Sequence, residues 1–310
     1  MPLRSLNILR KEIMGKHTFK QWFTATRPWS FPASAMPVAV TLAYLLWNGQ
    51  EVNWVNGVWA LLNIVVFHAA GNTWSDYFDF KYKVDAKDTF GAKFLTDGMF
   101  APKEIFRLAM GLLIVAVAGG LALAWRTGWE LLAIGAAGAV GTLLYPALKY
   151  RAWGDVDILL TYALLPTLGT CFVATGGFSA EALLVTLSSG LITVSILHAN
   201  NTRDVATDHR AGIRTLAMNL GHTTSVCLYL AEVLLPYLIV PICAAVGVLP
   251  WWTMLVVLSL PMSLSNCKLA LRSQKEGCGV IAGLDELSAK LQLVFNLLLT
   301  VGLVIAALIV

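Results

Sequence analysis

Long apolar runs separated by shorter polar connections dominate the chain. Nine of these runs reach the roughly 20 mostly apolar residues that a helix needs to cross about 30 Å of hydrocarbon. Because backbone polar groups in lipid must be satisfied internally, runs of this length are expected to be helical. The pattern therefore predicts an all-α, polytopic membrane protein with nine transmembrane helices. Their approximate limits are residues 31–49, 57–79, 104–125, 129–148, 157–177, 181–202, 223–248, 251–271 and 287–310.

The composition agrees with a membrane chain. The 310 residues are 57% hydrophobic and only 13% charged, with a mean hydropathy of +0.70. Ordinary soluble domains carry about twice that share of charged residues, so a soluble globular fold and a disordered chain are both excluded. The net charge is +4, but the charges lie between the apolar runs, so we expect a lipid bilayer as partner and no nucleic acid. The five cysteines lack CxxC spacing, and no disulfide or zinc framework is predicted.

Lysine and arginine residues gather on one side of the predicted membrane. They lie in the first thirty residues, in the connection at 80–103 and around the connections after the fourth, sixth and eighth runs. Arg126 is the only one of the 22 on the other side. By the positive-inside rule, the amino terminus is cytoplasmic. We therefore expect a multi-pass protein of the cytoplasmic (inner) membrane, with a cytoplasmic or interfacial arm at 1–30 and a nine-helix membrane domain at 31–310.

Two of the runs end in an amide and two carboxylates at helical spacing on this same side. Offsets of three and four residues place such side chains on one helix face. Carboxylates near hydrocarbon are costly unless a cation or a polar cavity compensates them. The residues are Asn72, Asp76 and Asp79 in GNTWSDYFDF at the end of the second run, and Asn200, Asp204 and Asp208 in HANNTRDVATDHRAG at the end of the sixth.

Oxygen ligands without histidine or cysteine suit Mg²⁺, which commonly completes its coordination with water and substrate phosphates. Cations suited to phosphate recognition lie beside the acids or on the same rim. The competing interpretation is that the acids are solvated loop residues, since one DxxD or DxxxD has little specificity. Two such segments on one side, each followed by a long basic loop, favour a magnesium-bridged pyrophosphate cradle at the cytoplasmic face. The neighbouring cations are Lys83, Lys93, Lys149, Arg151, Arg203 and Arg210.

The chain resembles the UbiA superfamily of intramembrane aromatic prenyltransferases. SDYFDFKYKVD and NNTRDVATD are similar to the two Asp-rich motifs of that family, with Ser75 where Asn is usual and Asn72 as the alternative amide. ATRPWSFPASAMPV, LYPALKYRAWGDV and NNTRDVATDHRAGIRTLAMNLG are similar to segments of one branch, the 1,4-dihydroxy-2-naphthoate polyprenyltransferases. The resemblance covers nearly the whole chain.

This resemblance implies Mg²⁺-dependent transfer from a polyprenyl pyrophosphate to an aromatic acceptor. For the dihydroxynaphthoate branch it further implies loss of CO2 in menaquinone biosynthesis. The implied catalytic residues are Asp76, Asp79, Asp204 and Asp208, which with Asn72 would hold the metal. Pyrophosphate would contact Lys93, Lys149 and Arg203, and the acceptor or leaving group Arg27 and Tyr145. Further candidates are Asp85, Asn200, Asn201 and Arg151.

Two kinds of alternative stay open at this point. Another acceptor, such as 4-hydroxybenzoate, homogentisate or a glycerol phosphate lipid, would fit the same motifs. A cation-coupled transporter would use the acids as ion sites, but it would be expected to carry them near the midplane, on broken helices in paired repeats. Carboxylates confined to one rim and accompanied by basic loops favour the transferase.

Overall fold

A computed structural model of the chain describes residues 17–86 and 89–309, so the first sixteen residues of the predicted arm lie outside it. Within the described part, nine helical segments are long and apolar enough to span a membrane, which confirms the predicted number. The elements are α2 (Phe19–Ala25), η1 (Pro28–Ser30), α3 (Pro32–Trp47), α4 (Trp54–Lys81), α5 (Pro102–Thr127), α6 (Glu130–Lys149), α7 (Gly154–Leu159), η2 (Leu160–Leu164), α8 (Leu165–Thr175), α9 (Ala180–Arg203), α10 (Val205–Arg210), α11 (Leu216–Leu220), α12 (His222–Leu234), α13 (Pro236–Ala245), η3 (Trp251–Ser259), α14 (Leu260–Glu276), η4 (Cys278–Ile281) and α15 (Leu284–Ile309).

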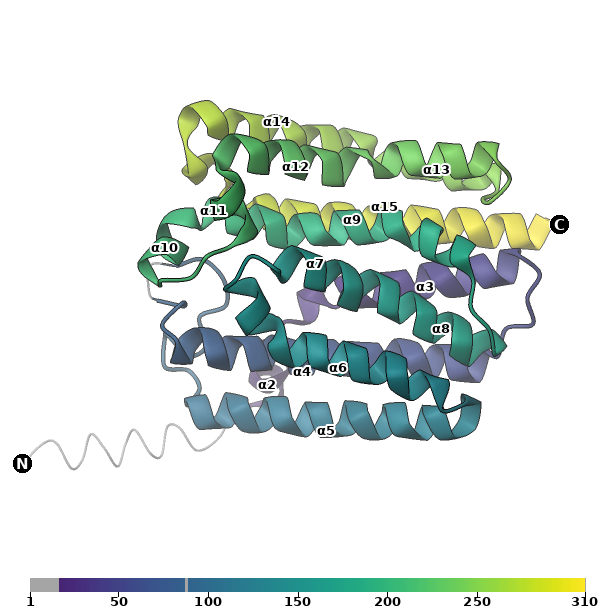
Figure 1. Cartoon of the computed structure of the whole chain (residues 1–310), viewed down its shortest axis with the longest axis horizontal. Coiled ribbons are helices and arrows are strands. Elements are labelled where there is room, and N and C mark those ends of the chain that lie inside the picture. The colour runs from purple at the N-terminus through teal and green to yellow at the C-terminus, as the bar shows by residue number, and fades with distance from the viewer. Residues whose placement is uncertain (1–16, 87–88, 310) are drawn as a thin grey trace, which may run out of the picture.

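The long helices run side by side, with α9 in the middle of the bundle (Figure 1). Helix α9 packs against α15, α12, α7, α13 and α3 and is the most enclosed of the nine spans, whereas α6 is the least enclosed. Small residues allow this central position because they let helix backbones approach closely. A methyl group at Gly190 would lie 2.7 Å from the Cβ atom of Ala163, so only glycine fits this crossing.

Prolines lie at the breaks of three spans that hydropathy predicts as single runs, at Pro166, at Pro236 and, between η3 and α14, at Pro261. Pro166 has no N–H for the preceding turn, and the chain widens there into the π-helical turn η2 between α7 and α8. Pro236 likewise separates α12 from α13, which hydropathy predicts as one run over 223–248. The breaks divide the fifth, seventh and eighth spans into separate helical elements.

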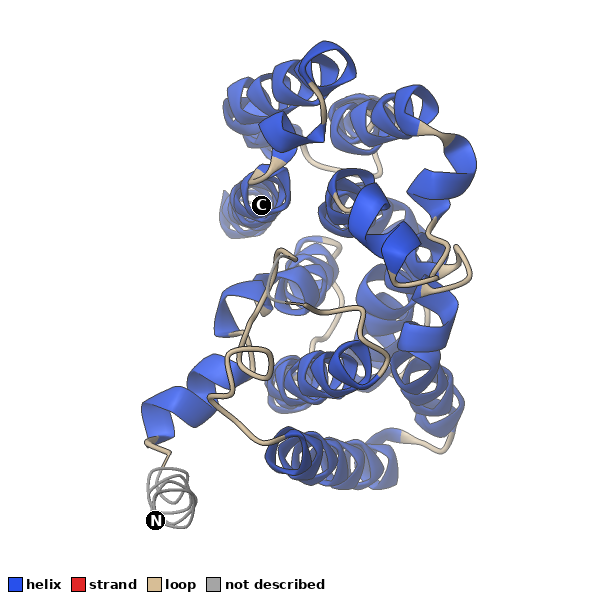
Figure 2. Ribbon diagram, turned by 90° about the vertical axis from the view of Figure 1, so that its left-hand side faces the viewer, coloured by secondary structure: helices blue, strands red, loops and turns tan. Residues whose placement is uncertain are grey.

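Both acidic segments lie at the same end of the molecule. Helices α4, α6 and α9 all finish there, and α10 and α11 extend from that end (Figure 1). Viewed from this end, loops cross the middle of the bundle as well as connecting helices at its edge (Figure 2). Arg126 lies near the last residue of α5, at the opposite end, where its Nε donates to Asn56 Oδ1 at 3.3 Å. One end of the bundle therefore carries most of the polar chemistry.

Candidate active site

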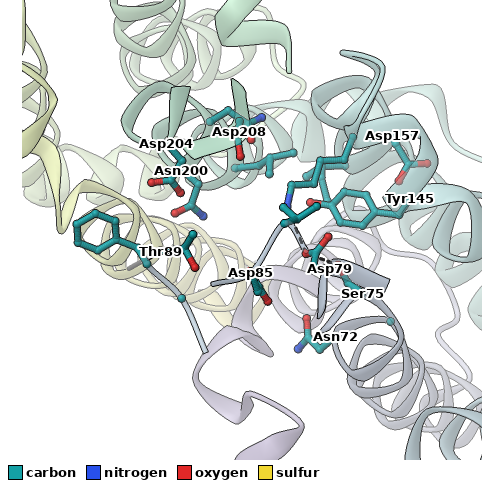
Figure 3. Close-up of a pocket in the computed structure, with 18 of the residues that line it drawn as sticks. Asn72, Ser75, Asp79, Asp85, Thr89, Tyr145, Asp157, Asn200, Asp204 and Asp208 are labelled. Carbon is teal, nitrogen blue, oxygen red and sulfur yellow. Dashed lines mark hydrogen bonds and ion pairs between the residues drawn. The ribbon is translucent and has the colours of Figure 1, made fainter. Parts of the chain in front are cut away.

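A cavity of about 190 Å³ lies between the ends of α4, α6, α7, α9 and α10 and the loop that follows α4. It brings the two acidic segments together from distant parts of the chain, and their side chains surround a common space (Figure 3). Of the residues singled out from the sequence, those that line it are Arg27, Asn72, Asp79, Asp85, Tyr145, Lys149, Asn200, Asn201, Arg203, Asp204 and Asp208.

Asp79 is the most heavily supported carboxylate of the first segment. The Tyr150 hydroxyl donates to its Oδ1 at 2.5 Å, while Lys149 Nζ and Ser75 Oγ lie 3.4 and 3.3 Å from its Oδ2. Burial and the Asp79 carboxylate raise the pKa of Tyr150, so the phenol keeps the proton that it donates. These three donors fix the direction in which Asp79 faces the cavity.

Asp76 does not share this cavity, which corrects the expectation that Asn72, Asp76 and Asp79 all point the same way. At about 100° per residue, Ser75 and Asp79 lie roughly 60° and 20° to one side of Asn72, and Asp76 about 40° to the other. The structure places Asn72, Ser75 and Asp79 in the cavity lining and turns Asp76 into a smaller recess beside it. There Asp76 forms an ion pair with Arg27.

Arg27 reaches Asp76 from the segment that precedes the first span. Its backbone has φ 57° and ψ 58°, a left-handed conformation that is uncommon for a side chain of this size. Asn72 secures this segment, because its Nδ2 donates to Thr26 O and Ser30 Oγ, both at 2.9 Å. Burial would lower the pKa of Arg27, but the carboxylates of Asp76 and Asp85 raise it above its ordinary value. The guanidinium therefore stays charged at the cavity wall.

A tight turn brings Asp85 back to the end of α4. The backbone N–H groups of Val84 and Asp85 both donate to Asp79 O, at 2.8 and 3.2 Å, and Lys83 has the positive φ of 59° that this reversal requires. Asp85 thus lies in the cavity despite its six-residue distance from Asp79. Burial and the Asp79 charge raise the pKa of Asp85 to about 6.

Arg203 organises the second acidic segment. Its Nε and Nη2 donate to the two carboxylate oxygens of Asp204, each at 2.7 Å, and Nη2 also donates to Asn200 Oδ1 at 2.8 Å. Its Nη1 donates to Asp285 Oδ1 at 3.0 Å, and the Phe90 ring lies 4.4 Å from the guanidinium carbon. In this arrangement Arg203 fixes Asp204 and joins α9 to the start of α15.

Asp208 differs from Asp204 in having no side-chain partner among residues 17–86 and 89–309. It is buried in α10, and its carboxylate makes no hydrogen bond or ion pair with the residues that the structure describes. Burial is the main cause that raises the pKa of Asp208 to about 6, although Lys149 opposes the shift. A buried carboxylate of this kind gains from a cation bound in the cavity.

One predicted phosphate ligand, Lys93, and one further candidate, Arg151, are not in the cavity lining. Lys93 lies in the loop before α5, outside the residues that line the cavity. Arg151 is exposed just after α6, where its backbone pairs with that of Arg214. Neither position supports the proposed contact in the arrangement seen here.

Two other residues were missed by the sequence reasoning. Tyr150 follows Lys149 directly in ALKYRAWGD. A phenol next to a candidate phosphate-binding lysine indicates that it lies near the same site. Asp157 lies inside an apolar run, in GDVDILL, and a carboxylate within a span is itself a sign of function. Both contribute to the site, Tyr150 through Asp79 and Asp157 as part of the cavity wall.

The donor chemistry of the cavity fits Mg²⁺. All its candidate ligands are oxygen atoms, the preferred donors for this ion. Within residues 17–86 and 89–309, no three acidic, histidine or cysteine side chains converge closely enough to form a complete metal cage. Asp79, Asp85 and Asp208 instead face a shared space, which leaves coordination positions for water and for substrate oxygens.

An apolar groove of about 420 Å³ adjoins the polar cavity. Residues of α4, α5, α6 and α8 form most of its wall, and Asn63 is one of its few polar side chains. Thr142 and Thr161 line both the groove and the polar cavity, so the two spaces meet at these residues. A ligand with an anionic head and an apolar tail would match this pair of spaces.

Comparison with known proteins identifies the family of the chain. Residues 35–280 match the UbiA prenyltransferase family. Over 303 residues the chain is 32% identical to UbiA prenyltransferase domain-containing protein 1 of Xenopus tropicalis, which covers 96% of this chain and 85% of that protein.

Solved structures show a similar fold. A UbiA homolog from Aeropyrum pernix K1 superposes with a TM-score of 0.62 at 14% identity, over 84% of this chain and 96% of that one. A homolog from Archaeoglobus fulgidus bound to GPP and Mg²⁺ gives a TM-score of 0.57 at 12% identity, over 90% of this chain and 99% of that one. At such identities the likeness concerns the fold alone.

Proposed function

The chain belongs to the UbiA prenyltransferase family, and on that premise we propose that it transfers a polyprenyl group from a polyprenyl pyrophosphate to an aromatic acceptor with the help of Mg²⁺. It is a multi-pass integral membrane protein, as its nine spans require. The observation that carries the proposal is the meeting of two carboxylate segments around one cavity that opens into an apolar groove. The pyrophosphate would occupy the cavity and the prenyl tail the groove.

The cavity residues suit the departure of pyrophosphate. Asp79, Asp85, Asp204 and Asp208, which all line the cavity, would hold Mg²⁺, which when bound neutralises negative charge on the leaving group. The Archaeoglobus fulgidus homolog, described as bound to GPP and Mg²⁺, supports this choice of ion. Lys149 and Arg27 line the same cavity and would contact the phosphate oxygens directly. Asp76 would act through Arg27, whose position it fixes.

We propose 1,4-dihydroxy-2-naphthoate as the acceptor, with loss of CO2 and a place in menaquinone biosynthesis. The segments LYPALKYRAWGDV and NNTRDVATDHRAGIRTLAMNLG support this choice by their similarity to that branch. The animal relatives are named for the family alone and give no support for the branch, so 4-hydroxybenzoate, homogentisate and a glycerol phosphate lipid stay as alternatives. A cation-coupled transporter is disfavoured because its acids would not be confined to one end of the bundle.

An acceptor series tests the assignment. Purified protein would be incubated with a labelled polyprenyl pyrophosphate, Mg²⁺ and each acceptor in turn, and the lipid product would be identified by mass. We expect a decarboxylated prenyl naphthoquinol from 1,4-dihydroxy-2-naphthoate. Product from 4-hydroxybenzoate alone would reject 1,4-dihydroxy-2-naphthoate as the acceptor but leave prenyl transfer as the reaction. No product from any acceptor would reject the proposed function.

Removal of a cavity carboxylate tests the magnesium cradle. Asp208→Ala and Asp76→Ala should each lower turnover on the order of 100-fold or more, the first by loss of a metal ligand and the second by release of Arg27. Asp97→Ala, an exposed loop carboxylate outside the cavity, is the control and should keep its turnover. Near-normal turnover of the Asp208 variant or of the Asp76 variant, with an intact fold in detergent, would reject the role given to that residue.

We propose that the acidic end faces the cytoplasm, as the distribution of lysine and arginine predicts. The assignment to an inner membrane stays a prediction from sequence. A single cysteine placed at Asp97, in an otherwise cysteine-free chain, should react with an impermeant thiol reagent only from the cytoplasmic side. A cysteine at Glu51, an exposed residue between α3 and α4 at the other end, should show the reverse. Labelling of both from the same side would contradict the predicted topology.

A further inference from the structure

Asp157 is a buried carboxylate in the wall of the polar cavity that has no partner of its own. It lies in α7, is 6% exposed and lines the cavity. Its carboxylate makes no hydrogen bond or ion pair within residues 17–86 and 89–309; only its backbone carbonyl accepts, from Thr161 Oγ1. Asp155, two residues earlier, is also buried, but it is held by His198 and Asn201. Unlike the carboxylate of Asp155, the carboxylate of Asp157 therefore receives no hydrogen bond from the described helices.

Its position is at the junction of the polar cavity and the apolar groove. Thr161, one helical turn further along, lines both spaces. A methyl group at Gly141 of α6 would lie 2.8 Å from Asp157 Oδ1, so the carboxylate sits at the level of Gly141. This level is about 12 Å deeper along α6 than the Cα atom of Lys149, two helical turns away. In the view of Figure 3, Tyr145 lies between Asp157 and Asp79.

This depth separates Asp157 from the pyrophosphate side of the cavity. The metal and the phosphate oxygens would lie near Asp79 and Lys149, at the end of the bundle. An anionic group would be repelled by Asp157, and no lysine or arginine side chain pairs with it in the described part of the chain. A buried carboxylate without a partner is costly and gains from a ligand that donates a proton to it. A neutral hydroxyl group that enters from the groove meets this requirement.

We propose that Asp157 accepts the hydroxyl proton of the aromatic acceptor during prenyl transfer, an inference that rests on the proposed function. The O–H bond breaks toward the Asp157 carboxylate, and the resulting electron density moves into the ring. The ring carbon next to this hydroxyl, which bears the ionised carboxyl group, then bonds to C1 of the prenyl group, while the electron pair of the prenyl C1–O bond leaves with pyrophosphate. The intermediate is a ring ketone that still carries the carboxyl group.

The proton returns in the second half of the reaction. The ring ketone loses CO2, and the electron pair of the broken C–C bond forms an enolate. The enolate oxygen takes back the proton from Asp157, which regenerates the carboxylate and yields the prenylated hydroquinone.

Asp157→Asn in the full-length protein tests this role, with the surface variant Asp97→Asn as control. At neutral pH we expect kcat to fall on the order of 100-fold in Asp157→Asn. KM for the polyprenyl pyrophosphate and the Mg²⁺-dependent release of pyrophosphate without acceptor should change less than about twofold, because no phosphate or metal ligand is removed. The loss should shrink as the pH approaches the pKa of the acceptor hydroxyl, since an ionised acceptor needs no base.

Two further measurements separate proton transfer from a structural role. An acceptor whose hydroxyl is methylated should react with wild type and Asp157→Asn at the same low rate. In Asp157→Ala, added formate should restore part of the turnover by filling the vacated site, which also covers the case in which Asp157→Asn does not fold.

The outcomes are distinguishable from failure of the proposed function. If wild type transfers the prenyl group, but Asp157→Asn keeps the wild-type kcat and pH profile, the role of Asp157 is rejected. It is also rejected if the methyl ether reacts as fast as the free hydroxyl in wild type, or if formate leaves Asp157→Ala unchanged. Failure of wild type with every acceptor would instead reject the transferase itself.

Discussion

At the scale of single residues, the site depends on side chains that hold other side chains. Tyr150 does not line the cavity but donates a hydrogen bond to Asp79, which does. Arg203 donates hydrogen bonds to Asn200, Asp204 and Asp285. Such second partners keep a metal-binding carboxylate in one orientation and typically change metal affinity or activity by 10- to 100-fold when they are removed. The charged residues of this site therefore divide into those that face the cavity and those that position them.

Tyr150→Phe isolates one of these positioning contacts. The change removes the hydroxyl that donates to Asp79 Oδ1 at 2.5 Å and leaves the ring in place. We expect the Mg²⁺ concentration for half-maximal rate to rise on the order of tenfold, because a hydrogen bond to a charged group contributes about 1.5–3 kcal/mol. Tyr82→Phe is the matched control, since Tyr82 is exposed and packs edge-on against Tyr150. Equal Mg²⁺ dependence in the two variants would contradict the positioning role.

The sequence revealed which residue types gather here, but not every contact between them. Helical spacing predicted that Asn72 and Asp79 share a face, and both line the cavity. The same spacing could not show that Asp76 turns toward Arg27, a residue 49 positions away, because no local pattern encodes that pairing. The position of Asp157 in the cavity wall could not be predicted for a related reason, because helices α6 and α7 form that wall only in the folded bundle.

At the scale of helices, hydropathy predicted the spans but not their internal shape. Hydropathy adds the transfer free energies of the side chains over a window of about 19 residues. This sum does not register the missing backbone N–H of Pro166 or Pro236. The π turn at Leu160–Leu164 is placed just below Asp157, and it keeps Thr161 at the junction between cavity and groove. A break that hydropathy cannot detect therefore shapes the part of the fifth span that contributes to the site.

Close helix packing makes a separate prediction at Gly302 of α15. A Cβ atom there would lie 2.4 Å from the carbonyl oxygen of Trp252 and 2.9 Å from Thr253 Cα, both backbone atoms of η3 that cannot rotate away. Gly302→Ala should therefore separate α15 from η3 and destabilise the protein by about 1–3 kcal/mol. The measurement is the thermal unfolding midpoint in detergent, which we expect to fall by several degrees.

Gly111→Ala supplies the control for this substitution. Gly111 lies in α5, and a Cβ atom added there meets nothing within 4 Å. Alanine favours a helix over glycine by about 0.5–1 kcal/mol, so this variant should unfold at the same temperature or slightly higher. Similar midpoints for Gly302→Ala and Gly111→Ala would show that the α15–η3 crossing has room that the structure does not indicate.

At the scale of the whole molecule, the bundle provides a polar environment and an apolar environment for the two parts of one substrate. Charged groups surround a small cavity at one end, and an apolar groove of about 420 Å³ continues from it between α4, α5, α6 and α8. A prenyl pyrophosphate has the same division, with an anionic head and a hydrocarbon tail. The arrangement lets the bilayer-embedded part of the fold shield the reacting carbon from water while the polar end binds the head.

The groove also predicts how the enzyme would select tail length. Gly138 of α6 lines the groove, and a Cβ atom there meets no other group within 4 Å, so a larger side chain can enter the groove without displacing a helix. Gly138→Trp should lower kcat/KM for long polyprenyl pyrophosphates at least tenfold, because burial of each tail methylene contributes about 0.8 kcal/mol. A short prenyl pyrophosphate that does not reach Gly138 should react as in wild type.

Gly111→Trp distinguishes blockage of the groove from a general effect of a bulky residue on a membrane helix. Gly111 has open space like Gly138 but does not line the groove. Rates would be measured for a series of chain lengths with both variants and wild type. A loss confined to Gly138→Trp and increasing with tail length assigns the groove to the tail. A uniform loss at all lengths, or the same loss in Gly111→Trp, would place the tail elsewhere, for example in contact with lipid.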